Sequence, residues 1–214
     1  MQWSIIWDYR EAMMHGLWVT IHLSAVGIAG STVLGVMVGG LSQASNYYVR
    51  RCVDTYIEVL RNIPLIVKLF FIYFAAGLSE MWAAYVALAL HQSAYIAELV
   101  VAGLRAVPAG QTEAAYSLAH GRRQTFFYVT LPQALANVIP PLTTQYVQVI
   151  KNSSVVMLIS VVELTGVTRQ IENDTFRGFE AATSVTLVYL ALVAVVVMAM
   201  NLLNRSLNRA GVRR

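Results

Sequence analysis

AMMHGLWVTIHLSAVGIAGSTVLGVMVGGLSQASNYYV, residues 12–49, is a run of 38 residues without Asp, Glu, Lys or Arg. About 20 apolar residues are enough to cross a hydrocarbon core of roughly 30 Å as a helix. The run is too long for the apolar part of a signal peptide, and acids as well as a base precede it. We therefore expect a membrane-spanning helix here that stays in the mature chain.

Three further runs free of charged residues follow, at 81–97, 124–150 and 181–204, and the apolar segment 62–78 contains a single Lys. The chain is 57% hydrophobic and 12% charged, whereas a soluble domain has about 25% charged residues. These features predict an all-α membrane protein with one transmembrane domain, residues 1–214, and argue against a water-soluble enzyme. The five expected spans cover about 14–40, 62–78, 81–101, 131–150 and 183–203.

Basic residues are unevenly distributed between the expected loops. Lys and Arg are enriched in cytoplasmic loops of membrane proteins, and that rule places the N-terminus outside and the C-terminus inside. We therefore interpret the net charge of +4 as a topology signal and expect no nucleic-acid partner. The outer basic residues are then Arg10, Arg169 and Arg177, and the inner ones are Arg50, Arg51, Arg105, Arg122, Arg123, Arg205, Arg209, Arg213 and Arg214.

Small residues in the first span and prolines near the fourth predict how these two helices pack and where they are interrupted. Glycine in a membrane helix lets a neighbouring helix approach closely, whereas proline interrupts a helix. Pro132, Pro140 and Pro141 therefore predict an interfacial helix ahead of the true fourth span. The glycines concerned are Gly27, Gly30, Gly35, Gly39 and Gly40.

Residues 163–180 carry four acids and two arginines and are expected to form an external loop. Its acids make a solvated outer face or a docking site for a partner; both interpretations stay open. The single cysteine, Cys52, cannot form an internal disulfide, and no Cys or His spacing suits a metal ion, so no metal site is expected. The four acids are Glu163, Glu172, Asp174 and Glu180.

The segment 108–123, PAGQTEAAYSLAHGRR, predicts a helix of about eight residues on the inner side. Thr112 is its expected N-cap, Glu113 suits the positive end of the helix dipole, and Gly121 is expected near its end. Isolated helices shorter than about 12 residues are marginal in water. We therefore expect a groove on a cytoplasmic partner to hold this helix.

Glu113-Ala114-Ala115, followed after fifteen residues by Leu131-Pro132, resembles the EAA signature of ABC importer permeases. The stretches 61–74, 93–115, 124–135 and 151–171 are similar to the branch that takes up polar amino acids. The pattern departs at two positions: Ala119 stands where the family has Gly, and Val129 where it often has Ile. With Ala119 in that place, Gly121 is expected to supply the turn.

This resemblance implies a type I ABC importer permease fold in the bacterial cytoplasmic (inner) membrane, with loop 105–129 as the cytoplasmic coupling segment. The implied partners are a dimer of ABC ATPase subunits, a second permease chain and an extracytoplasmic amino-acid-binding protein. ATP and Mg would be bound by the ATPase, since this chain has no GxxxxGK[ST] loop, and neither a cofactor nor a catalytic residue is expected here. The residues expected to contact the ATPase are Gly110, Gln111, Thr112, Glu113, Ala114, Ala115 and Gly121.

Ionisable residues inside spans mark pathways or pairs. Arg61 and Glu98 fall at similar depth near the inner face, so we expect a pair that is either structural or an inner gate. Lys68 is expected to face one polar cavity together with His91 and Gln92; the alternative is that its side chain extends to the headgroups. His91 is expected to form a hydrogen bond between helices, and a role in a proton relay is the alternative.

A second polar group follows the fourth span. Lys151, Asn152, Ser153 and Ser154 combine a cation with an expected helix N-terminus capped by Asn152 or Ser153, an arrangement that favours a carboxylate. The substrate pathway is thus expected to include Lys68, His91, Gln92 and these four residues. The cations Lys68, Lys151 and Arg61 outnumber the acid Glu98 in and near the spans, and this positive balance favours glutamate, aspartate or glutamine as substrate. Basic amino acids (arginine or histidine) and an ATP-independent channel or carrier are the alternatives.

Overall fold

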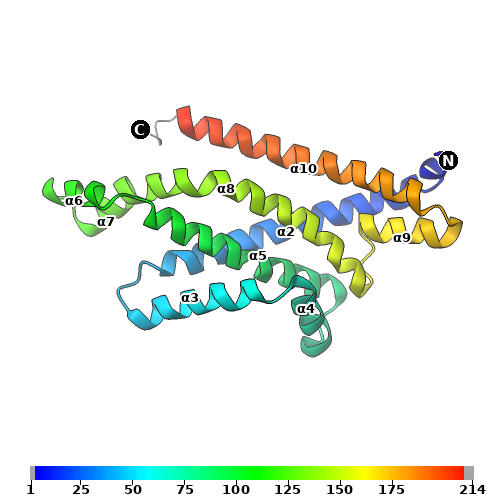
Figure 1. Ribbon diagram of the computed structural model, residues 1–214, viewed down its shortest axis with the longest axis horizontal. Coiled ribbons are helices and arrows are strands. Elements are labelled where there is room, and N and C mark those ends of the chain that lie inside the picture. Colours follow the sequence, from blue (N-terminus) through cyan, green and yellow to red (C-terminus); the bar gives the residue numbers. More distant parts are fainter. Residues whose placement is uncertain (1–2, 210–214) are drawn as a thin grey trace.

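The computed structural model describes residues 3–209, and every regular element in that range is helical, as the composition predicts. Long helices run side by side along the long axis of the molecule (Figure 1). In chain order the elements are α1 (Ser4–Asp8), α2 (Arg10–Leu41), α3 (Tyr47–Asn62), α4 (Leu65–Phe70), the π-helical turn η1 (Phe71–Ala75), α5 (Glu80–Arg105), α6 (Ala109–Ser117), α7 (Arg122–Thr125), the π-helical turn η2 (Phe126–Thr130), α8 (Leu131–Asn152), the 3₁₀ helix η3 (Ser153–Ile159), α9 (Leu164–Thr175) and α10 (Gly178–Arg209).

Helix α5 is the centre of the bundle, because α2, α3, α4 and α8 all pack against it. The approach of α2 is close: a Cβ atom added to Gly35 would lie 2.7 Å from Cβ of Ile96, and one added to Gly39 would lie 2.6 Å from Cβ of Val100. The predicted role of small residues in the first span is confirmed at these positions. Gly40 is different, since a Cβ there would meet nothing within 4 Å.

Three described helices are long and apolar enough to cross a membrane, namely α2, α5 and the Gly178–Ser206 part of α10. A fourth crossing is possible if Arg122–Ile159 and Leu164–Thr175, which meet at 48°, form one bent span. Within the span predicted over 62–78, the apolar helical part is Leu65–Ala75, about 17 Å at 1.5 Å per residue, so this crossing stays a prediction. Five crossings with the N-terminus outside stay a prediction.

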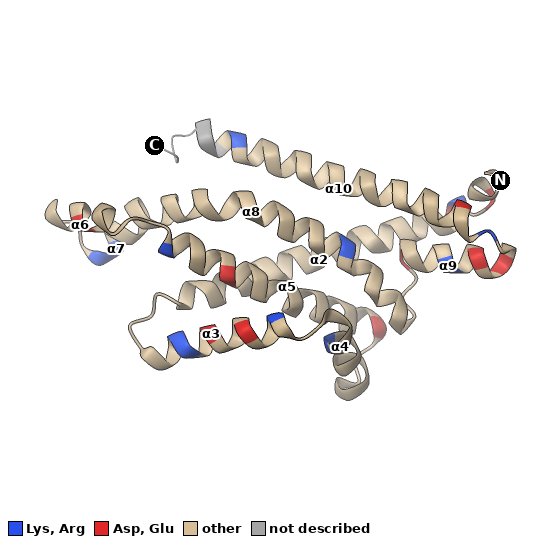
Figure 2. Cartoon of the chain, in the orientation of Figure 1, with Lys and Arg blue, Asp and Glu red and all other residues tan. Residues whose placement is uncertain are grey.

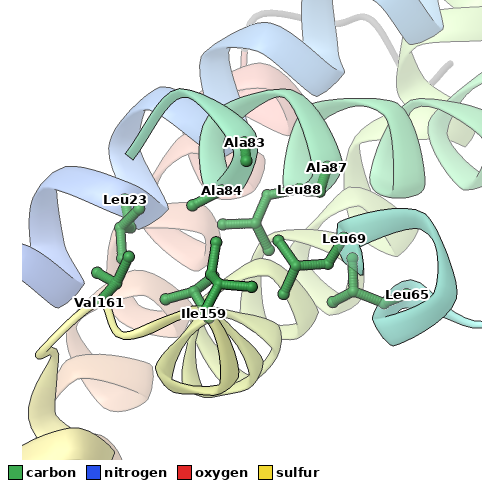
Figure 3. Packing of buried hydrophobic residues seen from close by; sticks show 10 residues of the cluster. Leu23, Leu65, Leu69, Ala83, Ala84, Ala87, Leu88, Ile159 and Val161 are labelled. Atoms are coloured by element: carbon green, nitrogen blue, oxygen red, sulfur yellow. The ribbon is translucent and has the colours of Figure 1, made fainter. Parts of the chain in front are cut away.

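The chain breaks before α4 for a local reason. Pro64 disfavours the α-helical conformation in the residue before it, and Ile63 is extended, with φ −90° and ψ 124°. Leu65 and Leu69 of α4 then lie in a buried apolar cluster with Leu88 of α5 and Ile159 of η3 (Figure 3). Burial of this apolar face holds α4 against α5 and η3.

The predicted interruption between an interfacial helix and the fourth span is wrong. Helical structure continues from Arg122 to Ile159, and Pro140 and Pro141 lie inside α8. Membrane helices tolerate proline where neighbouring groups satisfy the freed backbone carbonyls. The prolines therefore do not end the helix.

Most of the segment 163–180, predicted as an external loop, is the helix α9, so the predicted loop conformation is wrong and the external position stays a prediction. Leu164, Val167 and Ile171 recur at helical spacing and are fully buried, so an apolar face, not the acids, decides this segment. Glu163 is fully buried as the N-cap of α9 and Glu180 is buried too, so neither belongs to a solvated face.

The two ends of the molecule differ in charge. The N-terminus and the acid-bearing α9 lie at one end, whereas α6, α7 and the C-terminal part of α10, with its Arg205, lie at the other (Figures 1 and 2). Helix α7 contributes Arg122 and Arg123 there. This separation agrees with the expected topology, although Arg213 and Arg214 lie outside the described residues.

Candidate functional site

The segment between α5 and α8 projects from one end of the bundle as α6 (Figure 1). The three EAA residues differ in their exposure to solvent. Ala115 is the only buried residue of α6, 5% exposed, while Glu113 and Ala114 face solvent. Tyr116 and Leu118 are 50% and 74% exposed. Exposed apolar side chains on a short projecting helix are typical of a surface that a partner covers.

The predicted start of this helix is wrong. Helix α6 begins at Ala109, directly after Pro108, and Thr112 Oγ1 donates a hydrogen bond to the Ala109 carbonyl (2.7 Å) from within the first turn. Proline suits this place because the first backbone N–H groups of a helix have no intrahelical acceptor. Glu113 lies in the middle of the nine-residue helix, so the dipole argument for it does not hold. Gly110 and Gln111 are exposed in the first turn.

The predicted turn at Gly121 is wrong as well. Ala119 itself takes the left-handed conformation, with φ 61°, and the His120 N–H donates to the Ala115 carbonyl (3.2 Å) to close the end of α6. Gly121 has φ −70° and is the N-cap of α7. The turn thus stays at the position where the EAA pattern expects glycine.

Arg61 and Glu98 pair across α3 and α5, through Arg61 Nη1 and Glu98 Oε1. The Arg61 guanidinium also lies over the Tyr95 ring, 5.3 Å from its centroid. The pair borders a cavity of about 360 Å³ between the two helices. Its charged lining residues are Asp54, Glu58, Arg61, Glu98 and Arg105.

A second cavity, of about 240 Å³, lies between α5 and α8. Gln92 is buried and donates to Gln145 Oε1 across it, and the His91 ring packs edge-on against Tyr95 at 5.3 Å. Its lining has amide, hydroxyl and imidazole groups and no Lys, Arg, Asp or Glu. The lining residues are His91, Gln92, Tyr95, Thr144, Gln145, Gln148 and Asn152.

The expected pathway residues do not all meet. His91, Gln92 and Asn152 share the 240 Å³ cavity, but Lys68 does not line it. The buried Lys68 instead donates from Nζ to the Leu60 carbonyl (2.6 Å) near the end of α3, where a cation interacts favourably with the helix dipole. The Lys68 ammonium group therefore binds within the protein and does not extend to the surface of the chain.

The carboxylate site expected around residues 151–154 is wrong in its geometry. Lys151 and Asn152 are the last two residues of α8, and helical structure continues directly into η3, so no helix N-terminus with free N–H groups lies there. Lys151 and Ser154 face a separate groove against α10, and Ser153 is buried with its hydroxyl bonded to the Ile150 carbonyl (2.8 Å). The local sequence could not distinguish a helix end from a helix start.

Sequence reasoning missed four residues of the polar cavity: Tyr95, Thr144, Gln145 and Gln148. The signal was present, since Thr144, Gln148 and Asn152 follow one another at intervals of four residues in α8. Such spacing places them on one helix face. Polar residues on one face of a membrane helix point to the bundle interior or to a pathway.

The fold and these sites define a class: an α-helical, multi-pass membrane protein with polar cavities between its helices and an exposed helix that a partner can cover. The profile of a protein family described as "Binding-protein-dependent transport system inner membrane component" matches residues 31–209. The chain belongs to this family and is a transport subunit of the inner membrane.

Individual proteins agree with this assignment. The chain is 31% identical to the "Glutamine transport system permease protein GlnP" of Escherichia coli (strain K12), over 95% of this chain and 96% of that protein. It is 34% identical to the "Probable glutamine ABC transporter permease protein GlnM" of Bacillus subtilis (strain 168), over 97% and 98%. A solved structure, "Crystal structure of an amino acid ABC transporter with histidines", matches with a TM-score of 0.90 at 28% identity and covers 96% of this chain and 99% of its own.

Proposed function

We propose that the chain is the permease subunit of an ATP-driven importer for a polar amino acid, with its N-terminus outside and the loop 105–129 in the cytoplasm. The observation that carries the proposal is α6, which presents Glu113, Ala114 and exposed apolar side chains at the end of the bundle. A helix of nine residues is marginal by itself in water, and within the chain only Ala115 of α6 is buried. Family membership supports an ATPase as that partner.

In this proposal a dimer of ABC ATPase subunits binds ATP and Mg²⁺ and receives α6 in a cleft. A second permease chain, identical or related, completes the pathway, and an extracytoplasmic binding protein delivers the amino acid. The chain itself needs no cofactor and performs no hydrolysis. Each transport step then consists of a movement of α6 that changes how α3, α5 and α8 pack around the two cavities.

Charge reversal at Glu113 tests the coupling role. Glu113→Lys places a cation on the surface that the ATPase would cover, so we expect ATP-driven uptake to fall about tenfold or more, equivalent to 1.4 kcal/mol. Uptake and ATP hydrolysis are measured in proteoliposomes that contain the complete complex and its binding protein. Glu11→Lys, which reverses a 90% exposed side chain at the opposite end, is the control. Uptake by Glu113→Lys at the level of that control would refute the assignment, and uptake without ATP would favour a channel or carrier.

The substrate that the 240 Å³ cavity favours has an uncharged, hydrogen-bonding side chain, as glutamine has. A carboxamide can donate and accept, which matches the amides of Gln92, Gln145 and Gln148. An ionised side chain that enters without a counter-charge loses its hydration. Because neither Lys68 nor Lys151 lines this cavity, the argument for an acidic substrate loses its support.

Binding to the purified permease–ATPase complex, without the binding protein, tests this selectivity. We expect calorimetric titration to give a Kd for glutamine about tenfold or more below the values for glutamate and arginine. Gln145→Ala should weaken glutamine binding, since it leaves Gln92 without its partner across the cavity. Tighter binding of arginine or glutamate than of glutamine would contradict the neutral substrate and leave the coupling role untouched.

A further inference from the structure

We propose that the ring of Tyr95 is the inner barrier of the transport pathway, closing the polar cavity between α5 and α8 from the charged cavity between α3 and α5. This inference rests on the proposed function, because only a transport pathway needs such a barrier. It assigns the barrier to a residue that the sequence did not single out. The Arg61–Glu98 pair then serves to position this ring.

The position of Tyr95 between the cavities is the first support. Tyr95 lines both the 240 Å³ cavity and the 360 Å³ cavity. His91, Tyr95 and Glu98 follow at intervals of four and three residues on one face of α5. Along that face the polar cavity comes first, then the ring, then the charged cavity towards the end of the molecule that carries α6.

Contacts on two sides hold the ring in place. The His91 ring meets it edge-on, with centroids 5.3 Å apart and an interplanar angle of 69°. The Arg61 guanidinium lies over it at 5.3 Å and is itself paired with Glu98. The ring is thus fixed by a neighbour from the polar cavity and by one from the charged cavity.

These contacts are weak enough to break during a transport cycle. The side chains of Arg61 and Glu98 are 39% and 45% exposed, and ion pairs and cation–π contacts at such exposure contribute little. Arg61 stands in the last turn of α3, just before the break at Pro64. A movement of this end of α3 relative to α5 carries the guanidinium off the ring and frees it to turn.

Leak measurements on the complete complex test the barrier. Proteoliposomes are loaded with labelled L-glutamine, and its efflux is followed without ATP. We expect Tyr95→Ala to raise efflux about tenfold over the unchanged protein, as loss of a barrier of about 1.4 kcal/mol would. Tyr95→Phe keeps the ring and should keep efflux low, because the Tyr95 hydroxyl makes no hydrogen bond to another described residue.

Tyr85→Ala provides a matched control on the same helix. Tyr85 lines neither cavity and its hydroxyl bonds to His22 Nδ1 (2.8 Å). Efflux through Tyr85→Ala should stay at the level of the unchanged protein. Equal leak in the Tyr85 and Tyr95 alanine variants, or no leak in either, overturns the proposal.

A second measurement needs no known substrate and covers the case in which Tyr95→Ala fails to assemble. Because Cys52 is the single cysteine, Cys52→Ser gives a thiol-free chain, and Gln148→Cys then places one thiol in the polar cavity. A membrane-impermeant maleimide is then applied from the side of the ATPase. It should label this thiol slowly when residue 95 is Tyr or Phe. With Tyr95→Leu, labelling should be about tenfold faster, because the same barrier is lost. Equal labelling rates overturn the barrier even if the complex transports glutamine. Absence of ATP-driven glutamine uptake in the unchanged complex, with a Tyr95-dependent labelling rate, would instead contradict only the proposed function.

Discussion

Ala119 has a backbone conformation that is unfavourable for a residue with a side chain. Its φ of 61° lies in the left-handed region, which costs a residue with a Cβ about 1–2 kcal/mol. The turn it makes ends α6, the helix that we propose couples to the ATPase. The resemblance to the EAA pattern marked this position as unusual, but the expectation that Gly121 takes over the turn was wrong, because the turn geometry follows from where α6 ends.

Ala119→Gly is expected to stabilise the turn by up to about 1 kcal/mol, since relief of the strain exceeds the added entropy of glycine in the unfolded chain. Amide hydrogen exchange of α6 in the detergent-solubilised complex should become slower. Gly121→Ala is the matched control: its φ is −70° and an added Cβ would meet only Gln124 Oε1 at 3.9 Å, so exchange should barely change. Slower exchange in Gly121→Ala than in Ala119→Gly would show that Ala119 is not the strained residue of this turn.

Helix α9 shows how one residue can decide the placement of an element. Glu163 accepts hydrogen bonds from the N–H groups of Thr165 and Gly166 (both 2.9 Å) and from the Tyr189 hydroxyl (2.5 Å). The first two cap α9, and the third ties its start to α10. A carboxylate buried in this way is a structural anchor.

Removal of this anchor should destabilise the protein. Glu163→Ala loses a cap, at about 0.5–2 kcal/mol, and leaves buried donors without an acceptor, at about 1–3 kcal/mol. We therefore expect the thermal midpoint of the purified Glu163→Ala complex to fall by several degrees. The midpoint of Glu163→Gln should lie between those of Glu163→Ala and the unchanged protein, because glutamine keeps one acceptor oxygen. Glu11→Ala, at a 90% exposed side chain, serves as control. A midpoint for Glu163→Ala equal to that of the control would mean that the acid is not an anchor.

At the scale of the whole molecule, the contact of α2 with α5 holds the bundle together. Glycines of α2 allow the backbones to approach, and a Cβ added to Gly39 would lie 2.8 Å from the Ala97 carbonyl oxygen as well as 2.6 Å from Cβ of Val100. Such a side chain fits only if the two helices separate. The stability of the bundle therefore depends on the absence of a Cβ at this point.

Two neighbouring glycines test this dependence. Gly39→Ala should cost about 1–3 kcal/mol through overpacking, whereas Gly40→Ala, where nothing lies within 4 Å, should be neutral or slightly stabilising through its helix propensity. Thermal unfolding of the two purified variants, each in the complete complex, provides the comparison. Similar midpoints would indicate that α2 and α5 are not in contact through Gly39.

The sequence by itself determined the properties that depend on neighbouring residues in the chain. Long uncharged runs predicted an all-helical membrane protein, and the segment 108–123 predicted a short exposed helix, because hydrophobicity and helix length are local quantities. The resemblance of Glu113-Ala114-Ala115 to the EAA pattern led to the family that the profile match establishes. Extended backbone at Ile63 before Pro64 follows from the same local sterics.

Only the tertiary structure decided which polar groups meet. The rotation of each helix about its axis brings Gln92 to Gln145 and the Arg61 guanidinium to Tyr95, while it turns Lys68 towards the Leu60 carbonyl. It also buries Glu163, which charge alone assigned to water. These placements result from packing between segments far apart in the chain, where a rotation of one residue, about 100° in a helix of 3.6 residues per turn, exchanges a pathway position for one that faces lipid.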